Sequence, residues 1–328
     1  MSIYVNLCSI VTKEKSAEIC VNLRPADTGG LIRVQAFFVL AALVLVMTGL
    51  PPAVAGDGSP DSPQLLSPQG PVAQGEVARV LLRGVPAGAT VAGSWQGEAV
   101  GFFPLANGDW EGLLGVDLRL TPGNYPLEVR LQPRGQTPVL WKEPVQVVAK
   151  NYGVERLELP ERMVTLDAKT LKRVKQEGMR FSALWEQRSP ECYWREPFLR
   201  PVPGPVLSGF GRNRVINGEQ RSPHTGLDLR ATLGEPVLAS NSGRIALVGE
   251  FFFNGRAVVI DHGFGLYTMY FHLSEVKVKT GERVERGAMI GLAGATGRAS
   301  GPHLHWGVRL AGARVDPLAL LKATGGEP

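Results

Sequence analysis

The chain of 328 residues is long enough for two domains and additional segments, and its 44% apolar and 20% charged residues are typical of a globular protein. Its 40 glycines and 25 prolines predict many turns and favour a mainly β protein. The net charge is +5. The sequence contains no cluster of Lys and Arg residues interleaved with aromatic residues, which argues against a nucleic-acid partner.

Residues 1–55 predict a leader and a signal peptide. Arg33 precedes an apolar run over residues 34–47, and Ala-Val-Ala at 53–55 has the small-x-small pattern of a cleavage site, with cleavage after Ala55. The apolar run is shorter than the roughly 20 residues that span a membrane comfortably. We therefore expect an exported protein, either periplasmic or associated with the cell envelope. The alternative is an uncleaved segment that anchors the chain in the membrane.

Two segments follow the leader. Residues 56–74 are rich in Pro, Ser and Gly, which is typical of a flexible linker. Residues 75–150 alternate short apolar runs, such as 77–82, with turn signals, such as Pro-Gly-Asn at 122–124. This spacing predicts a β-sandwich-like domain. The segment contains no histidine and no catalytic cluster, so we expect either a targeting module or a passive spacer.

Residues 151–200 predict a helical connector. Asp167 is a favourable N-cap residue, and the apolar residues from Leu171 to Trp185 recur at helical spacing with charged residues between them. The Ser-Pro pair at 189–190 marks the end of the helical pattern.

Residues 201–322 contain strand-like runs, many of them separated by glycine-centred turns. The stretch 276–291 has a rhythm that is also found in lipoyl and biotinyl carrier domains, which predicts a rolled antiparallel β-sheet and suggests a cofactor carrier as a rival function. A carrier needs a modifiable lysine at its hairpin tip, and the turn at 241–243 has none. We therefore interpret the rhythm as evidence of fold rather than of function.

All five histidines of the chain lie in this last segment. His224 and Asp228 form a His-x-x-x-Asp motif, His303 and His305 form a distant His-x-His motif, and His272 lies between the two motifs. Residues i and i+2 of a strand point to the same face, so His303 and His305 can face one cleft. Catalytic zinc takes three protein ligands and keeps one position open. His224, Asp228 and one of the two later histidines would supply such a set.

The two motifs and their flanks resemble the M23 family (lysostaphin/LytM-type) of zinc metallopeptidases, which cut peptide cross-links in bacterial peptidoglycan. The resemblance extends over about residues 204–320 and includes Gly-Phe-Gly at 209–211 and Gly-Pro-His-Leu-His at 301–305. It implies a LytM fold, the duplicated hybrid motif, for the C-terminal domain.

The resemblance also implies the roles of the site residues. It assigns His224, Asp228 and His305 as ligands of one Zn²⁺ ion, and it assigns the two catalytic roles, polarising the water and stabilising the transition state, to His272 and His303.

No ligand position departs from the family pattern, so we expect a metalloendopeptidase with peptidoglycan as its partner. The alternative is a catalytically latent peptidoglycan-binding scaffold or an amidase activator. His262 lies in an Asp-His-Gly sequence before a predicted turn, and we interpret it as structural.

Overall fold

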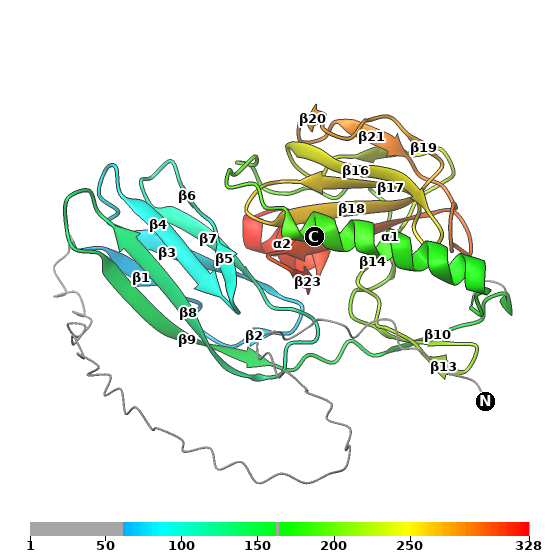
Figure 1. The fold of residues 1–328 in the computed structure, drawn as a ribbon, viewed down its shortest axis with the longest axis horizontal. Helices are drawn as coiled ribbons and strands as arrows, with labels where there is room; N and C mark the ends of the chain where they lie inside the picture. The colour runs from blue at the N-terminus through cyan, green and yellow to red at the C-terminus, as the bar shows by residue number, and fades with distance from the viewer. Residues whose placement is uncertain (1–61, 162–163, 328) are drawn as a thin grey trace, which may run out of the picture. The chain divides into compact units, whose positions relative to one another are not determined.

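A computed structural model describes residues 62–161 and 164–327 (Figure 1). The predicted leader and signal peptide lie outside the described residues. Within these ranges the chain is mainly β, which confirms the predicted fold class, and it has two α-helices, α1 (Ala168–Glu186) and α2 (Pro317–Thr324). Neither helix is long and apolar enough to cross a membrane.

The first part of the described chain forms two sheets that pack as a β-sandwich. The strands are β1 (Gln64–Leu66), β2 (Val72–Ala73), β3 (Val77–Arg83), β4 (Thr90–Trp95), β5 (Glu98–Val100), β6 (Phe102–Pro104), β7 (Trp110–Gly115), β8 (Gly123–Gln132) and β9 (Val139–Val148). One sheet has the order β1-β3-β7-β6 and the other β2-β9-β8-β4-β5. Side chains of both sheets, among them Val80, Trp95, Leu114 and Leu127, form one buried core.

The strands β1 and β2 lie within residues 56–74, for which the sequence predicts a flexible linker. β1 pairs antiparallel with β3, and β2 pairs parallel with β9. Val72 is buried in the sandwich core and Leu65 packs against it. The linker prediction is therefore wrong for residues 64–73, because their short apolar runs extend the edges of the two sheets.

The connector contains a strand in addition to the predicted helix. α1 begins after Asp167, whose side chain accepts a hydrogen bond from the Thr170 N–H at 2.6 Å, which confirms the N-cap prediction. The strand β10 (Val154–Leu157), which the sequence did not predict, pairs in parallel with β12 (Asn213–Ile216). β13 (Glu219–Gln220) completes this three-stranded sheet.

The last part of the chain is built on a larger antiparallel sheet. Its remaining strands are β11 (Val206–Ser208), β14 (Gly226–Arg230), β15 (Pro236–Leu238), β16 (Gly243–Phe251), β17 (Gly255–Asp261), β18 (Leu266–Leu273), β19 (Glu275–Val276), β20 (Arg283–Val284), β21 (Met289–Leu292), β22 (His303–Leu310) and β23 (Ala313–Val315). The larger sheet has the order β11-β14-β22-β18-β17-β16-β20, with β23 beside β22. β15, β21 and β19 form a second, smaller sheet.

Both faces of the larger sheet carry buried apolar clusters. On one face, side chains such as Ile260, Tyr270 and Trp306 enter the main core. On the other face, α1 packs its apolar side against the strands (Figure 1). That second cluster consists of Phe181, Leu184 and Trp185 of α1 together with Ala246, Leu247, Phe251, Ala257, Val259, Tyr267, Met269 and Phe271.

The main core also takes in side chains of the sandwich. Phe103 and Leu113 belong to the same buried cluster as Trp194 and Leu310. Nearby, the Arg314 guanidinium donates to both carboxylate oxygens of Asp117, at 2.7 and 2.9 Å. The sandwich and the last part of the chain therefore share buried apolar surface and are joined by a bidentate ion pair.

His262 is fully buried and has a hydrogen-bond partner at each ring nitrogen. Its Nδ1 lies 2.8 Å from the Ser242 carbonyl oxygen, and its Nε2 lies 2.8 Å from the Thr268 hydroxyl oxygen. A carbonyl oxygen can only accept, so Nδ1 carries the hydrogen and Nε2 accepts from Thr268. These contacts agree with a structural role for the neutral ring.

Burial lowers the pKa of His262 from 6.5 to about 4, although the Ser242 hydrogen bond acts to raise it. The unfolded chain therefore binds this proton more tightly than the folded chain does. The contribution to stability is complete above pH 6.5 and is lost as the pH falls through 4. We expect a loss of up to about 3 kcal/mol in the free energy of unfolding from this group.

A His262→Gln protein should lose less stability over this pH range than the unsubstituted protein does. Urea midpoints measured for both proteins from pH 7 to pH 4 test this expectation. Equal acid-induced losses would contradict it.

Candidate active site

Pairing of β14 with β22 brings the two histidine motifs together. In this antiparallel register Asp228 lies opposite His305, and Arg230 lies opposite His303. Residues directly opposite each other in a sheet project to the same face, and so do residues i and i+2. Asp228, His303 and His305 therefore project to one face of the sheet, and His224 lies just before β14.

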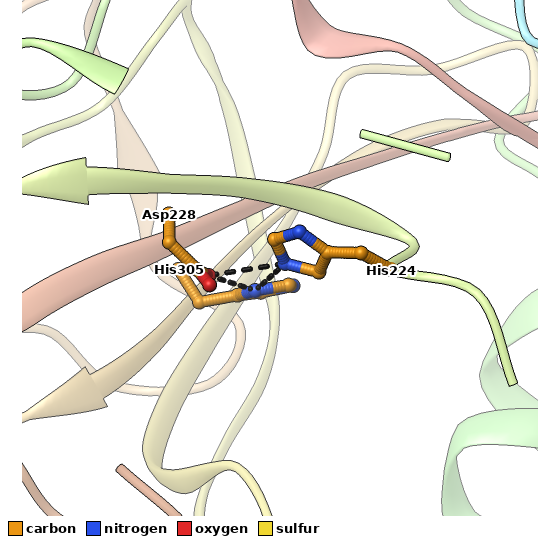
Figure 2. Close-up of side chains that lie close together, drawn as sticks. All are labelled: His224, Asp228 and His305. Atoms are coloured by element: carbon orange, nitrogen blue, oxygen red, sulfur yellow. Dashed lines mark hydrogen bonds and ion pairs between the residues drawn. The ribbon is translucent and has the colours of Figure 1, made fainter. Parts of the chain in front are cut away.

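Three potential ligand atoms converge at this point (Figure 2). Asp228 Oδ1 lies 3.0 Å from His224 Nε2 and 2.8 Å from His305 Nδ1, and the two nitrogens lie 3.0 Å apart. The structure thus brings together all three residues for which the sequence predicts metal binding. Two imidazoles and one carboxylate can supply three corners of a tetrahedral metal site, leaving the fourth corner open.

Neighbouring groups determine which His224 nitrogen carries the hydrogen. His224 Nδ1 lies 3.0 Å from the Gly209 carbonyl oxygen and 3.2 Å from the Ser208 hydroxyl. Because the carbonyl only accepts, Nδ1 is the donor and the lone pair of Nε2 faces Asp228 and His305. A histidine that binds a metal usually donates its other N–H to such a partner. His224 is therefore in the tautomer that metal binding requires.

The His305 ring is held between a glycine and an aromatic ring. A Cβ atom at Gly226 would lie only 2.6 Å from His305 Nε2 and 2.6 Å from the Trp306 carbonyl oxygen. The Phe271 ring lies parallel to the imidazole, with an interplanar angle of 2° and centroids 5.3 Å apart. Gly226 thus leaves the space that the His305 ring occupies, and Phe271 sets its plane.

The charge states of Asp228 and His305 also suit a metal ion. Burial acts to raise the pKa of Asp228, but its close contacts with the imidazoles of His224 and His305 outweigh it, so the pKa lies below its ordinary value. Burial lowers the pKa of His305, although Asp228 opposes this effect. An ionised carboxylate and a neutral imidazole are the forms that bind metals.

His272 and His303 lie beside these three residues, with ring centroids 4.8 Å apart. Their Nδ1 atoms each lie 2.8 Å from a backbone carbonyl oxygen, that of Thr296 for His272 and that of Gly301 for His303. Each ring therefore donates from Nδ1 and keeps Nε2 as an acceptor. Burial, reinforced by the neighbouring histidines, lowers the pKa of His272 to about 3, so this ring is neutral near pH 7.

A backbone irregularity directs His272 toward the site. The residue has φ 64°, in the left-handed region, and the β17–β18 register shifts at this end of the strand. In a regular strand His272 would face away from its neighbour Phe271, whereas a bulge re-aims a side chain. Such a conformation costs about 1–3 kcal/mol for a non-glycine residue, and such residues are concentrated at functional sites.

The sequence interpretation missed Arg214 and Glu155. Arg214 Nη2 donates to Asp228 Oδ2 at 3.0 Å, and Arg214 Nε donates to Glu155 Oε2 at 3.0 Å. The contact between Arg214 and Glu155 depends on the pairing of β10 with β12. No local pattern in the sequence marks that pairing.

Comparisons with known proteins identify relatives of the segment that carries these residues. A sequence model of Peptidase family M23 matches residues 222–317. The peptidoglycan DD-endopeptidase ShyA of Vibrio cholerae is 41% identical over 114 residues, which are 34% of this chain and 26% of that protein. The DD-carboxypeptidase/endopeptidase Mpg of Neisseria meningitidis is 43% identical over 101 residues, 31% of this chain and 23% of that protein. The chain thus spans about a quarter of the length of these relatives.

One solved structure matches over a longer range. The crystal structure of a putative peptidase M23 from Pseudomonas aeruginosa is 33% identical, with a TM-score of 0.60. The match covers 76% of this chain and 95% of that chain, so it extends well beyond the segment matched by the family model.

The fit of the His305 ring against Gly226 can be tested by adding one methyl group. We expect Gly226→Ala to displace the ring and to weaken metal binding about tenfold or more. Gly178→Ala is the matched control, because a Cβ atom at Gly178 in α1 would meet nothing within 4 Å. Metal content after dialysis against a metal buffer measures the effect. Equal metal content in the two variants would contradict the expectation.

Proposed function

Because this chain belongs to peptidase family M23, we propose that it is a zinc-dependent endopeptidase that hydrolyses peptide cross-links of bacterial peptidoglycan. The observation that most strongly supports this function is the convergence of His224, Asp228 and His305 beside two further histidines that keep Nε2 as an acceptor. The names of the relatives ShyA and Mpg, both described as endopeptidases, support the substrate class.

His224, Asp228 and His305 would hold the zinc ion through Nε2, Oδ1 and Nδ1. The bound ion would act as a Lewis acid toward the scissile carbonyl and make a water molecule acidic enough to react near neutral pH. The protein's part is to keep the His305 imidazole neutral and the Asp228 carboxylate ionised, as the pKa shifts of both groups favour.

His272 and His303 would carry out the proton transfers. One of them would accept a proton from the attacking water at Nε2 and return it to the leaving nitrogen as the C–N bond breaks, and the other, when protonated, would donate a hydrogen bond to the oxygen of the scissile carbonyl. The low pKa of His272 keeps its Nε2 available as an acceptor across the neutral range. The carbonyl oxygens of Thr296 and Gly301 hold both rings in the orientation that this role needs.

We further propose that the protein acts outside the cytoplasm, in the periplasm or cell envelope, where peptidoglycan lies. We place the sandwich at residues 64–150, the connector at 151–200 and the peptidase domain at 201–322. The complete donor set favours an enzyme over a catalytically latent scaffold or amidase activator.

Digestion of purified peptidoglycan, with and without a chelator, tests the proposed activity. We expect loss of cross-linked fragments, identified by mass spectrometry, that the chelator prevents and added Zn²⁺ restores. His305→Ala should lose both zinc and activity, by more than about 100-fold, because even changes around a ligand cost about 10- to 100-fold. Intact cross-links with a protein that retains zinc would instead support the latent scaffold.

His272→Ala separates the role of ligand from that of proton acceptor. We expect this variant to keep its zinc and to lose about 10²- to 10⁴-fold in kcat, the usual contribution of a positioned acid or base. Zinc content and turnover are measured on the same preparation. Loss of zinc from His272→Ala would show that this residue is a ligand.

A further inference from the structure

We infer that Arg214 and Glu155 are positioning residues for the metal ligand Asp228, so that a strand of the connector completes the metal site. The inference rests on the proposed metal site but concerns residues outside its ligand set. It makes β10 part of the active site rather than a link between domains.

The two oxygens of Asp228 have separate partners. Oδ1 faces His224 Nε2 and His305 Nδ1, at 3.0 and 2.8 Å. Oδ2 accepts from Arg214 Nη2 at 3.0 Å. The guanidinium thus fixes the rotation of the carboxylate and engages Oδ2, so that Asp228 offers a metal ion one oxygen.

Arg214 can do this because its guanidinium bridges two carboxylates. While Nη2 bonds Asp228, Nε bonds Glu155 Oε2 at 3.0 Å. The three side chains are largely shielded from water, with 22% of Arg214 and 14% each of Glu155 and Asp228 exposed. A lysine carries the same charge but has a single ammonium group in place of the planar fork, so it would not hold both carboxylates in this geometry.

The backbone places Glu155 opposite Arg214. In the parallel pairing of β10 with β12, Glu155 is the register partner of Arg214. Backbone bonds tie both ends of this pairing, from Asn213 N to Gly153 O at 3.0 Å and from Asn217 N to Leu157 O at 3.0 Å. The Asn217 side chain adds bonds to the N–H and the carbonyl of Leu159, each at 2.9 Å. The connector strand is therefore held in one register, and its carboxylate is held with it.

Charge-conserving variants test the assignment, because they alter geometry without changing the net charge near the metal. The variants are Arg214→Lys, Glu155→Asp and the double variant Arg214→Gln/Glu155→Gln, which removes one charge of each sign. The matched control is Arg79→Lys, which alters an arginine–glutamate pair with Glu111 in the sandwich. Zn²⁺ affinity is measured by competition with a chromogenic chelator, and the coordination geometry by the visible spectrum of the Co²⁺-substituted protein.

We expect Arg214→Lys and the double variant to bind Zn²⁺ about 10- to 100-fold more weakly than the unsubstituted protein, and to show a changed Co²⁺ spectrum. Glu155→Asp should show a smaller loss, since Arg214 keeps its bond to Asp228 but has a shorter partner. Arg79→Lys should leave both measurements unchanged.

Unchanged Zn²⁺ affinity and Co²⁺ spectra in Arg214→Lys and the double variant would overturn the inference. An equal loss of affinity in Arg79→Lys would also overturn it, by showing a general effect of altering an ion pair. The outcome is separable from that of the proposed function, because metal affinity is measured without substrate. If the unsubstituted protein hydrolyses peptidoglycan and the variants keep their Zn²⁺ affinity, only the positioning role is refuted. If the unsubstituted protein is inactive and the variants lose Zn²⁺ affinity as expected, only the peptidase activity is refuted.

Discussion

The register between β14 and β22 is the constraint on which the site depends. It places Asp228 opposite His305 and sends both side chains to one face of the sheet. Because side chains alternate along a strand, a slip of one residue would turn His303 and His305 of β22 to the other face. That other face carries buried residues such as Leu304 and Trp306, so such a slip would also expose core side chains. The core therefore enforces the geometry of the polar site.

Around this pair of strands, backbone carbonyl oxygens do much of the orienting. The carbonyls of Gly209, Thr296 and Gly301 accept from Nδ1 of His224, His272 and His303, respectively. Each contact leaves Nε2 facing the site, although the three carbonyls belong to different places along the chain. A carbonyl cannot donate or change its charge, so it fixes a tautomer more firmly than a titratable side chain would.

The sequence predicted the parts of the structure that depend on local patterns. The helix after Asp167 followed from its cap and apolar spacing, and the shared face of His303 and His305 followed from strand alternation. No local pattern predicts the left-handed backbone conformation of His272 or the pairing that joins Glu155 to Arg214. Both features depend on neighbours that are distant in the chain. The linker prediction failed because two short apolar runs, at 64–66 and 72–73, lie within the Pro-, Ser- and Gly-rich stretch and pair with the sheets.

The core that the sandwich shares with the last part of the chain also limits how this protein can evolve. Phe103 and Leu113 are packed with Trp194 and Leu310, and Asp117 is paired with Arg314. Gene recombination that exchanged the sandwich for an unrelated module would remove half of each contact, exposing apolar side chains and leaving Arg314 without Asp117. The two parts should therefore be inherited together, and substitutions at their boundary should be accepted in compensating pairs.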